Sequence, residues 1–445
     1  MPRDRKSLLI VLDAARFDET SAAFDASRLG LLRDSARPTL IAPSCWTAPS
    51  VTSMLTGRFP SEHGRQWPLG GPYPPVPTIA DLLELAGGSF LMLSGNNLCA
   101  PPLLPLREDQ VHRPHAGRRL GVAFGRTFRG LDYGSREILR RVQRMAAKGT
   151  LPDLLVLHLQ EAHHPYLPPP HGFAPGKCLR YATGHAGYYL RCAQRAWEFA
   201  ARADEAAWAD ARRRYSECVR YVVGIAEGVL RAYQRAGVME ETLAIITADH
   251  GEHLGEHGLA DHQGSLHEEL LHCPCALIAP PLRAGRAVRG QFQHTDLLRT
   301  ICGWHDLPTG DCGSAWPALD LLDEAHSGGH RYAFAEWLAW GEEQLCTLQR
   351  RNPSYDFAPL DRHLVAVRTV RWKLIRGSDG NEMLFGLRSD PRESRNIATH
   401  EPAVLRELGA ALEEWLAVVR AERRPEQRTG ASPVIEARLR ELGYV

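Results

Sequence analysis

The fold of this chain is constrained most by one short apolar segment. The segment ends abruptly in an acid, an imidazole and a glycine. It runs from Leu243 to Thr247, and Asp249-His250-Gly251 follow one residue later. An apolar run bounded by polar residues predicts a buried central strand, and ligands of open α/β sheets bind just past the carboxyl ends of such strands. A carboxylate and an imidazole placed there can bind a divalent cation. For an isolated Asp-His-Gly, a capping aspartate beside a structural histidine is the simpler interpretation, so the other motifs decide.

The amino-terminal segment repeats this pattern. The run Leu8–Leu12 predicts a second buried strand, and Asp13 stands at its carboxyl end, either as a ligand or as a cap of the next helix. Strands and helices alternate from residue 8 to about residue 305, which predicts an α/β fold with a mostly parallel sheet and helices on both faces. Further strands are expected at Pro38–Ala42, Phe90–Ser94, Leu154–Leu159 and Cys275–Ala279.

A polar residue in a third segment, Thr47, is expected at the start of a helix. Pro49 suits the first turn of that helix, and Gly57 suits its carboxyl cap. The backbone N–H groups at a helix amino terminus and the helix dipole attract anions. Thr47 therefore stands where an anionic group would bind, although taken alone the pattern favours an N-cap threonine.

The pattern changes after about residue 305. Four short strand-like segments and a helix at about 402–419 predict a small antiparallel sheet with a packing helix. We therefore expect a catalytic α/β domain over residues 1–310 and an α+β subdomain with a terminal extension over residues 311–445. Lys373, on one of these strands, is expected to be an ordinary surface charge. The strand-like segments lie near residues 331–338, 363–368, 371–376 and 383–387.

Composition argues against several classes of partner. The formal net charge is +1, so there is no electrostatic reason to expect nucleic acid or an anionic membrane. The ten cysteines are scattered without a Cys-x-x-Cys pair, which indicates reduced thiols rather than a disulfide framework. The run Leu8–Leu12 is too short for a signal peptide, and no stretch approaches the ~20 apolar residues of a membrane span. Together these features predict a cytoplasmic protein.

Several motifs follow one another in an order that resembles the sulfatase family, within the alkaline-phosphatase-like superfamily. They are Leu12-Asp13, Thr47–Val51 with Leu55–Pro60, Glu161–Tyr166, Thr247–Gly258, and the tail segments Arg371–Ile375 and Ser389–Ser394. In this register Thr47 occupies the nucleophile position of the family motif Cys/Ser-x-Pro-Ser-Arg. The resemblance implies an alkaline-phosphatase/sulfatase-like fold and a metal-dependent hydrolase acting on a small anionic sulfate or phosphate ester.

The departures from the family pattern are informative. Formylglycine-forming sulfatases need cysteine or serine where this chain has Thr47, and the arginine of the motif is Val51. The usual Gly-Lys-x-His segment corresponds to Gly95–Leu98, and the usual paired acids are reduced to Asp13 followed by Ala14. This pattern is similar to threonine-nucleophile phosphodiesterases, phosphonate hydrolases and phosphoryl-group transferases. It favours phosphodiester or phosphonate ester substrates over aryl sulfates, with a transferase or a catalytically silent anion-binding protein as alternatives.

The strand-end positions and the resemblance together predict one metal site. Asp13, Asp249 and His250, with the Thr47 hydroxyl, would bind one divalent cation at one edge of the sheet. The cation would lower the pKa of the hydroxyl, which is otherwise too weakly acidic to be a nucleophile. Attack on phosphorus or sulfur would form a threonine ester, later hydrolysed or transferred to an acceptor. Oxygen ligands favour calcium, magnesium or manganese, and the histidine admits manganese or zinc.

Two histidines are candidates for binding a substrate oxygen or protonating the leaving group. His163 fits the family register better than His164 does, and His262 is the second candidate, with Asn97 as a weaker one. A positioned acid contributes roughly 10²–10⁴ in rate. A second metal ion would need an Asp-x-x-x-His spacing that residues 158–164 lack, so one ion is expected.

Overall fold

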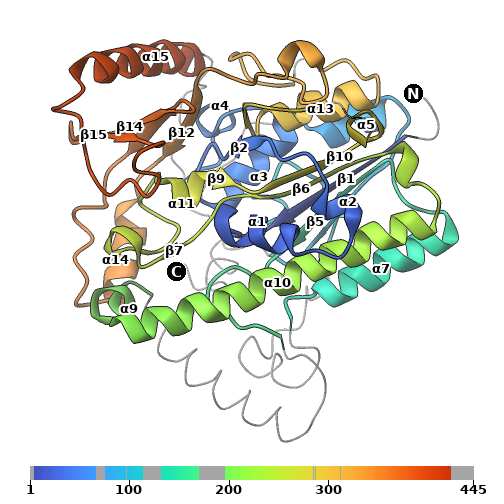
Figure 1. Ribbon diagram of the computed structural model, residues 1–445, viewed down its shortest axis with the longest axis horizontal. Coiled ribbons are helices and arrows are strands. Elements are labelled where there is room, and N and C mark those ends of the chain that lie inside the picture. Colours follow the sequence, from blue (N-terminus) through green and yellow to red (C-terminus); the bar gives the residue numbers. More distant parts are fainter. Residues whose placement is uncertain are drawn as a thin grey trace, which may run out of the picture.

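A six-stranded sheet lies at the centre of the larger part of the computed structural model (Figure 1). The structure describes residues 5–66, 76–96, 98–113, 132–169, 196–283, 285, 287–310 and 312–421. One edge strand, β10, is antiparallel to β6, and all other neighbouring strands of this sheet are parallel. In their order across the sheet, the strands are β10 (Cys275–Ile278), β6 (Thr242–Ala248), β1 (Lys6–Leu12), β5 (Leu154–Leu159), β3 (Phe90–Ser94) and β4 (Val111–His112).

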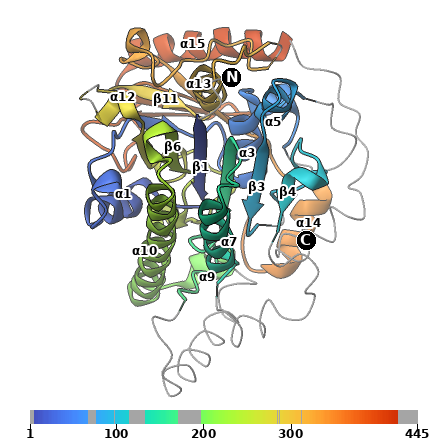
Figure 2. The same cartoon turned by 90° about the vertical axis from the view of Figure 1, so that its right-hand side faces the viewer.

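Successive residues of the central strands enter two hydrophobic cores. Leu8, Ile10 and Leu12 of β1 pack on one face of the sheet, and Leu9 and Val11 pack on the other. Because both faces are buried, the strand is apolar throughout, which explains the continuous run in the sequence. Helices α1 (Phe17–Asp25), α7 (Ser135–Lys148) and α10 (Glu205–Arg235) cover the first face, and α3 (Thr47–Thr56), α5 (Ile79–Leu85) and α13 (Asp296–Trp304) cover the second (Figure 2). The predicted fold class is confirmed.

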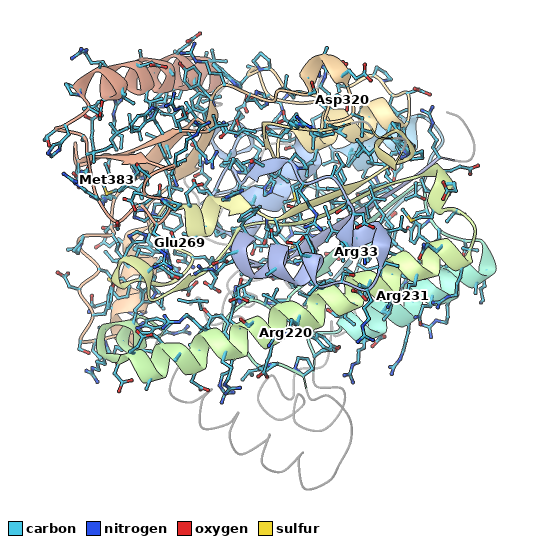
Figure 3. The ribbon with its side chains drawn as sticks, in the orientation of Figure 1. Arg33, Arg220, Arg231, Glu269, Asp320 and Met383 are labelled. Atoms are coloured by element: carbon cyan, nitrogen blue, oxygen red, sulfur yellow. The ribbon has the colours of Figure 1, made fainter. Side chains whose placement is uncertain are left out.

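The helix α10 has one buried face and one charged face. Tyr215 and Val222 are fully buried. Arg220 is exposed, and Arg231 pairs with Glu227 at 2.8 Å. Figure 3 labels these two arginines on the helix. The helix packs side by side with α7, whose position the sequence did not predict (Figures 1 and 2). Within the described part of the chain, no helix combines the length and the apolar character that crossing a membrane requires.

Smaller elements surround the sheet and support its carboxyl edge. A three-stranded sheet in the order β11-β2-β9 places β2 directly before the Thr47 segment. The predicted carboxyl cap of α3 is confirmed, because Gly57 has φ +67° and a Cβ there would lie 3.1 Å from Gly313 Cα. The remaining elements of this part are α2 (Gly30–Arg33), β2 (Thr39–Ile41), α4 (Pro60–His63), α9 (Ala196–Arg202), β7 (His253–Leu254), β8 (Ala260–Asp261), α11 (Glu268–Leu271), β9 (His272–Cys273), α12 (Pro280–Arg283) and β11 (Gln291–Gln293).

The carboxyl-terminal part forms an antiparallel sheet covered by one helix. Its core includes Phe334 and Trp415, whose rings stack with centroids 4.9 Å apart. The four strands and the helix lie where the sequence predicts them, whereas α14 (Glu342–Arg351) was not predicted. The division at residue 310 stays a prediction, and the terminal extension lies outside the described residues. The elements are β12 (Ala333–Trp337), β13 (Leu364–Arg368), β14 (Trp372–Gly377), β15 (Glu382–Gly386) and α15 (Pro402–Ala421).

The expectation that Lys373 is a surface charge is wrong. Its side chain is 0% exposed, and its Nζ lies 3.2 Å from Glu268 Oε1 and 3.1 Å from Glu393 Oε1. Arg368 on the neighbouring strand also pairs with Glu268, at 2.9 Å. The strand β14 faces α11 of the preceding part of the chain, so a cation on this strand is buried between two acids. This ionic cluster links the carboxyl-terminal sheet to the segment that follows His262.

Candidate active site

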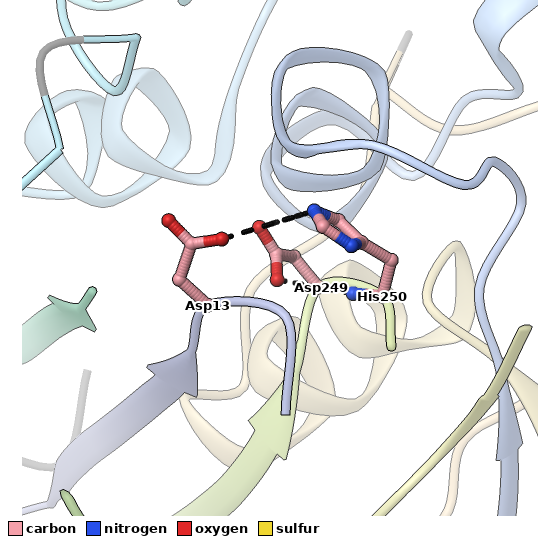
Figure 4. A group of neighbouring side chains, drawn as sticks. All are labelled: Asp13, Asp249 and His250. Carbon is pink, nitrogen blue, oxygen red and sulfur yellow. Dashed lines mark hydrogen bonds and ion pairs between the residues drawn. The ribbon is translucent and has the colours of Figure 1, made fainter. Parts of the chain in front are cut away.

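The two predicted aspartate ligands leave the central sheet side by side. Strands β1 and β6 are parallel neighbours with Leu12 opposite Ala248, so Asp13 and Asp249 follow at the same level of the carboxyl edge. Both carboxylates and the His250 ring are 0% exposed. His250 Nε2 lies 3.8 Å from Asp13 Oδ1 and 3.6 Å from Asp249 Oδ2, and Figure 4 shows the three side chains converging. These three residues are close enough for one metal ion to contact all of them.

Thr47 brings a hydroxyl from a third segment to this group. It is the first residue of α3, and the N-cap is Trp46, so Thr47 is not the N-cap residue that its sequence context alone suggests. Its Oγ1 lies 3.3 Å from His250 Nε2. Thr47 and Ala48 begin α3, and the helix dipole favours negative charge at this end. Thus the structure brings together all four residues that the sequence predicts as metal ligands, and their roles stay a prediction.

The protonation state of His250 suits a ligand. Its Nδ1 lies 2.8 Å from the Gly251 carbonyl oxygen, and only a protonated Nδ1 can donate to that acceptor. Burial lowers the pKa of His250 to about 3, so the ring is neutral at pH 7. Its Nε2 therefore keeps a lone pair, which faces Thr47 and the two carboxylates. A neutral imidazole oriented by a backbone carbonyl is the usual form of a histidine that binds a metal.

One oxygen of Asp13 has the environment expected of a metal ligand. Asn96 Nδ2 donates to Asp13 Oδ2 at 2.7 Å, but the buried Oδ1 accepts no hydrogen bond from any described residue. An unpaired carboxylate oxygen away from water is costly, and it lies on the side of His250 Nε2. Burial and the neighbouring Asp249 raise the pKa of Asp13. A divalent cation would satisfy this oxygen and remove the repulsion, so these residues fit such an ion.

Asp249 is held in place by backbone groups. Its Oδ1 accepts hydrogen bonds from the N–H groups of Ala14, at 3.1 Å, and His250, at 3.0 Å. Burial alone would raise the pKa of Asp249, but His250 and a hydrogen bond from His158 lower it below its ordinary value. The carboxylate is therefore ionised at neutral pH, and its second oxygen is available for a cation.

The second catalytic candidate, His262, lies beside the proposed ligands. Its ring centroid is 4.3 Å from that of His250 and 5.0 Å from that of His163. Its Nδ1 lies 2.7 Å from Asp261 Oδ1 and 3.3 Å from Glu252 Oε1. Burial opposes the charged form, but these two acids raise the pKa of His262 well above its ordinary value. The result is an imidazolium next to the site, which suits the binding of an anionic oxygen.

The same acids and His262 are also close enough to share a cation. However, both carboxylates converge on Nδ1 of His262, and Asp261 also accepts the N–H of His262 at 2.7 Å. A hydrogen-bonded imidazolium between two acids accounts for this arrangement without a second ion. The expectation of one metal ion stays a prediction.

The first catalytic candidate, His163, is 7% exposed at the edge of the same group. Its Nδ1 donates to the carbonyl oxygen of His164 at 2.7 Å. The nearby Glu161 instead accepts from Tyr133 N, at 2.9 Å, and from the Ser135 hydroxyl, at the start of α7. Glu161 thus caps a helix. The weaker candidate Asn97 lies outside the described residues.

Sequence reasoning missed four residues that hold the site: Asn96, His158, Glu252 and Asp261. Asn96 donates a hydrogen bond to Asp13. His158 offered a signal, because it is a polar residue near the carboxyl end of the apolar strand β5. Glu252 and Asp261 offered none beyond their nearness to His250 and His262 in the sequence. Which side chain they contact depends on how the segment after β6 turns back over the sheet.

The family comparison agrees with this fold and site. A model of the sulfatase family, described as Sulfatase, matches residues 7–307. That span covers most of the chain, including the three segments that converge on the proposed cation. The chain therefore belongs to the sulfatase family.

Individual relatives are more distant. The chain is 28% identical over 195 residues to arylsulfatase K of Canis lupus familiaris, an alignment that covers 43% of this chain and 34% of that protein. The chain thus spans about a third of the length of this curated relative. The family supports the expectation that the chain is a hydrolase acting on sulfate or phosphate esters.

Two solved structures illustrate the range of proteins with this fold. The phosphonate monoester hydrolase of Agrobacterium radiobacter is similar with a TM-score of 0.66 and 17% identity, over 94% of this chain and 96% of that one. A second structure, solved with its substrate D-glucosamine-2-N,6-O-disulfate, is similar with a TM-score of 0.62 and 14% identity, over 96% of this chain and 100% of that one. At these identities the similarity establishes the fold alone.

Proposed function

We propose that this protein is a metal-dependent ester hydrolase in which Thr47 is the covalent nucleophile. The observation that carries the proposal is the position of Thr47 Oγ1, 3.3 Å from His250 Nε2 and therefore at the group formed by His250, Asp13 and Asp249. Asp13, Asp249 and His250 would hold a divalent cation, which would lower the pKa of the Thr47 hydroxyl and neutralise charge on the substrate. Calcium, manganese, magnesium and zinc all suit this set of ligands.

The remaining residues take the other parts of the reaction. Thr47 gives up its hydroxyl proton to solvent, and its Oγ1 forms a bond to phosphorus or sulfur while the bond from that atom to the leaving oxygen breaks. The helix amino terminus behind Thr47 and the imidazolium of His262 stabilise negative charge on the oxygens that do not react. His163 or His262 gives a proton to the leaving oxygen. Water then cleaves the threonine ester and regenerates the hydroxyl.

The proposed substrates are phosphodiesters or phosphonate esters rather than aryl sulfates. Threonine cannot be converted to formylglycine, which removes the usual sulfatase nucleophile. A phosphonate monoester hydrolase has the same fold, and so does a protein solved with a sulfated sugar. A phosphoryl-group transferase using the same intermediate is the alternative, and the hydroxyl beside the ligand group argues against a silent binding protein. We also propose a cytoplasmic location, which the buried thiols of Cys45, Cys99 and Cys273 support.

A substrate panel tests the proposal. Nitrophenyl esters of a phosphate monoester, a phosphodiester, a phosphonate and a sulfate are assayed with wild type, Thr47→Ala, Thr47→Ser and Thr52→Ala. We expect the diester or phosphonate to be turned over fastest, and the loss of the nucleophile in Thr47→Ala to cost roughly 10⁴-fold or more. Thr47→Ser keeps a hydroxyl and should keep measurable activity.

The matched control is Thr52→Ala, which removes another buried hydroxyl from the same helix α3. It should leave turnover unchanged. Equal turnover by Thr47→Ala and wild type would remove Thr47 from its role. Transfer of the phosphoryl group to an added alcohol faster than to water would instead favour the transferase.

A further inference from the structure

A fully buried histidine lies directly behind the proposed metal ligands. His158 is on the central strand β5, between β1 and β3, with Val11 and Ser94 as its neighbours in the sheet. Its side chain is 0% exposed. Because the strand is paired on both sides, the backbone at His158 is held rigidly. The starting point of the imidazole side chain is therefore also well defined.

His158 contacts both aspartates and also the side chain of Cys99. Its Nε2 lies 3.3 Å from Asp249 Oδ2, within hydrogen-bonding distance, and 4.0 Å from Asp13 Oδ2. His158 does not belong to the group that can share an ion among the described residues, which consists of Asp13, Asp249 and His250. It therefore acts on the ligands and not on the ion itself.

His158 donates its hydrogen bond to the Asp249 oxygen that faces His250. Asp249 Oδ1 is held by two backbone N–H groups. Asp249 Oδ2, which lies 3.6 Å from His250 Nε2, accepts from His158. On the other carboxylate, Asn96 donates to Oδ2 of Asp13 and leaves Oδ1 facing the site. Thus each aspartate is held through specific atoms while one oxygen of each faces His250.

We propose that His158 is a positioning residue that sets the metal affinity of this site, by donating a hydrogen bond from Nε2 to Asp249 Oδ2. The inference rests on the metal site of the proposed function. Residues that orient metal ligands from behind contribute about 10–100-fold to metal affinity. Here the donor comes from a rigid central strand, so its loss allows the carboxylate to turn and weakens binding of the ion.

Two substitutions of His158 distinguish the effect of the hydrogen bond on metal affinity from the effect of having any polar side chain at this position. His158→Gln places an amide N–H near the position of Nε2 and keeps the bond to Asp249. His158→Asn places its amide near the position of Nδ1, so the donor does not reach Asp249. Affinity for Mn²⁺ is measured on metal-free protein by the loss of the electron paramagnetic resonance signal of free Mn²⁺. We expect affinity close to wild type for His158→Gln and about 10–100-fold weaker affinity for His158→Asn.

The matched control is His305, another buried histidine. Its Nε2 lies 2.7 Å from the hydroxyl of Ser7, at the opposite end of β1. His305→Asn should leave the Mn²⁺ affinity unchanged even if it lowers the melting temperature. If His158→Asn does not fold, as judged by circular dichroism, His158→Leu provides the same comparison with a residue that has no donor.

The outcomes distinguish this inference from the proposed function. Equal Mn²⁺ affinities for wild type and for a folded His158→Asn or His158→Leu protein would overturn the role of His158. By contrast, if wild type bound no Mn²⁺, or if Asp249→Ala bound it as tightly as wild type, the proposed metal site itself would be wrong.

Discussion

Replacing Lys373 by methionine should destabilise this protein strongly, because the lysine neutralises two buried acids. Methionine keeps most of the apolar stem and removes the charge. The Glu393 side chain is 0% exposed, and its other described polar contacts are His267 Nδ1, at 3.1 Å, and the N–H of Glu268, at 2.7 Å. Although burial opposes it, Lys373 lowers the pKa of Glu393, so this carboxylate is charged.

The expected magnitude follows from what remains after the substitution. Removing one partner of a buried ion pair costs about 3–5 kcal/mol because the other charge is left uncompensated. Glu268 keeps Arg368 at 2.9 Å, so the uncompensated charge is mainly that of Glu393. We therefore expect Lys373→Met to cost about 3 kcal/mol, at the lower end of that range.

The assay is urea unfolding followed by circular dichroism, with equal slopes required before the free energies are compared. The control is Arg331→Met, which removes a cation from an exposed pair with Glu407 in the same part of the chain. That pair has side chains 73% and 51% exposed, and such pairs contribute roughly 0–1 kcal/mol. A loss for Lys373→Met no larger than that for Arg331→Met would refute the reasoning. The double variant with Glu393→Gln should recover part of the loss, since it removes the uncompensated charge.

Three further outcomes are expected. Burial and the nearby Asp132 raise the pKa of Glu161 to about 7, so the folded protein holds a proton that the unfolded chain releases. The melting temperature should therefore fall as pH rises from about 5 to about 7. Glu161→Gln should flatten that profile, and an unchanged slope in the variant would contradict the prediction. His262→Gln should lower kcat by roughly 10²–10⁴-fold, whereas His257→Gln, at an exposed histidine outside the site, should leave it unchanged. Removal of divalent ions with a chelator should abolish turnover and lower the melting temperature, and both should return on adding Mn²⁺; full activity after chelation would exclude the metal site.

Local patterns in the sequence were sufficient for the elements that carry the site. The strands β3 and β5 have the predicted bounds Phe90–Ser94 and Leu154–Leu159, because a strand buried on both faces must be apolar from end to end. The start of α3 at Thr47 and its end at Gly57 follow from a nearby proline and a glycine. Since Asp13 and Asp249 directly follow apolar runs, their place at the carboxyl edge also followed from short-range information.

The partners of buried charges were decided only by the tertiary structure. His158 contacts Asp249 across 91 residues, and Lys373 contacts Glu268 across 105 residues. No local pattern encodes such pairs, because they depend on which strands become neighbours and on which face of a strand another segment covers. For the same reason, the sequence alone predicts a surface position for Lys373. The sequence by itself thus determined the strands, the family and the candidate ligands, whereas long-range packing determined which side chains neutralise and orient them.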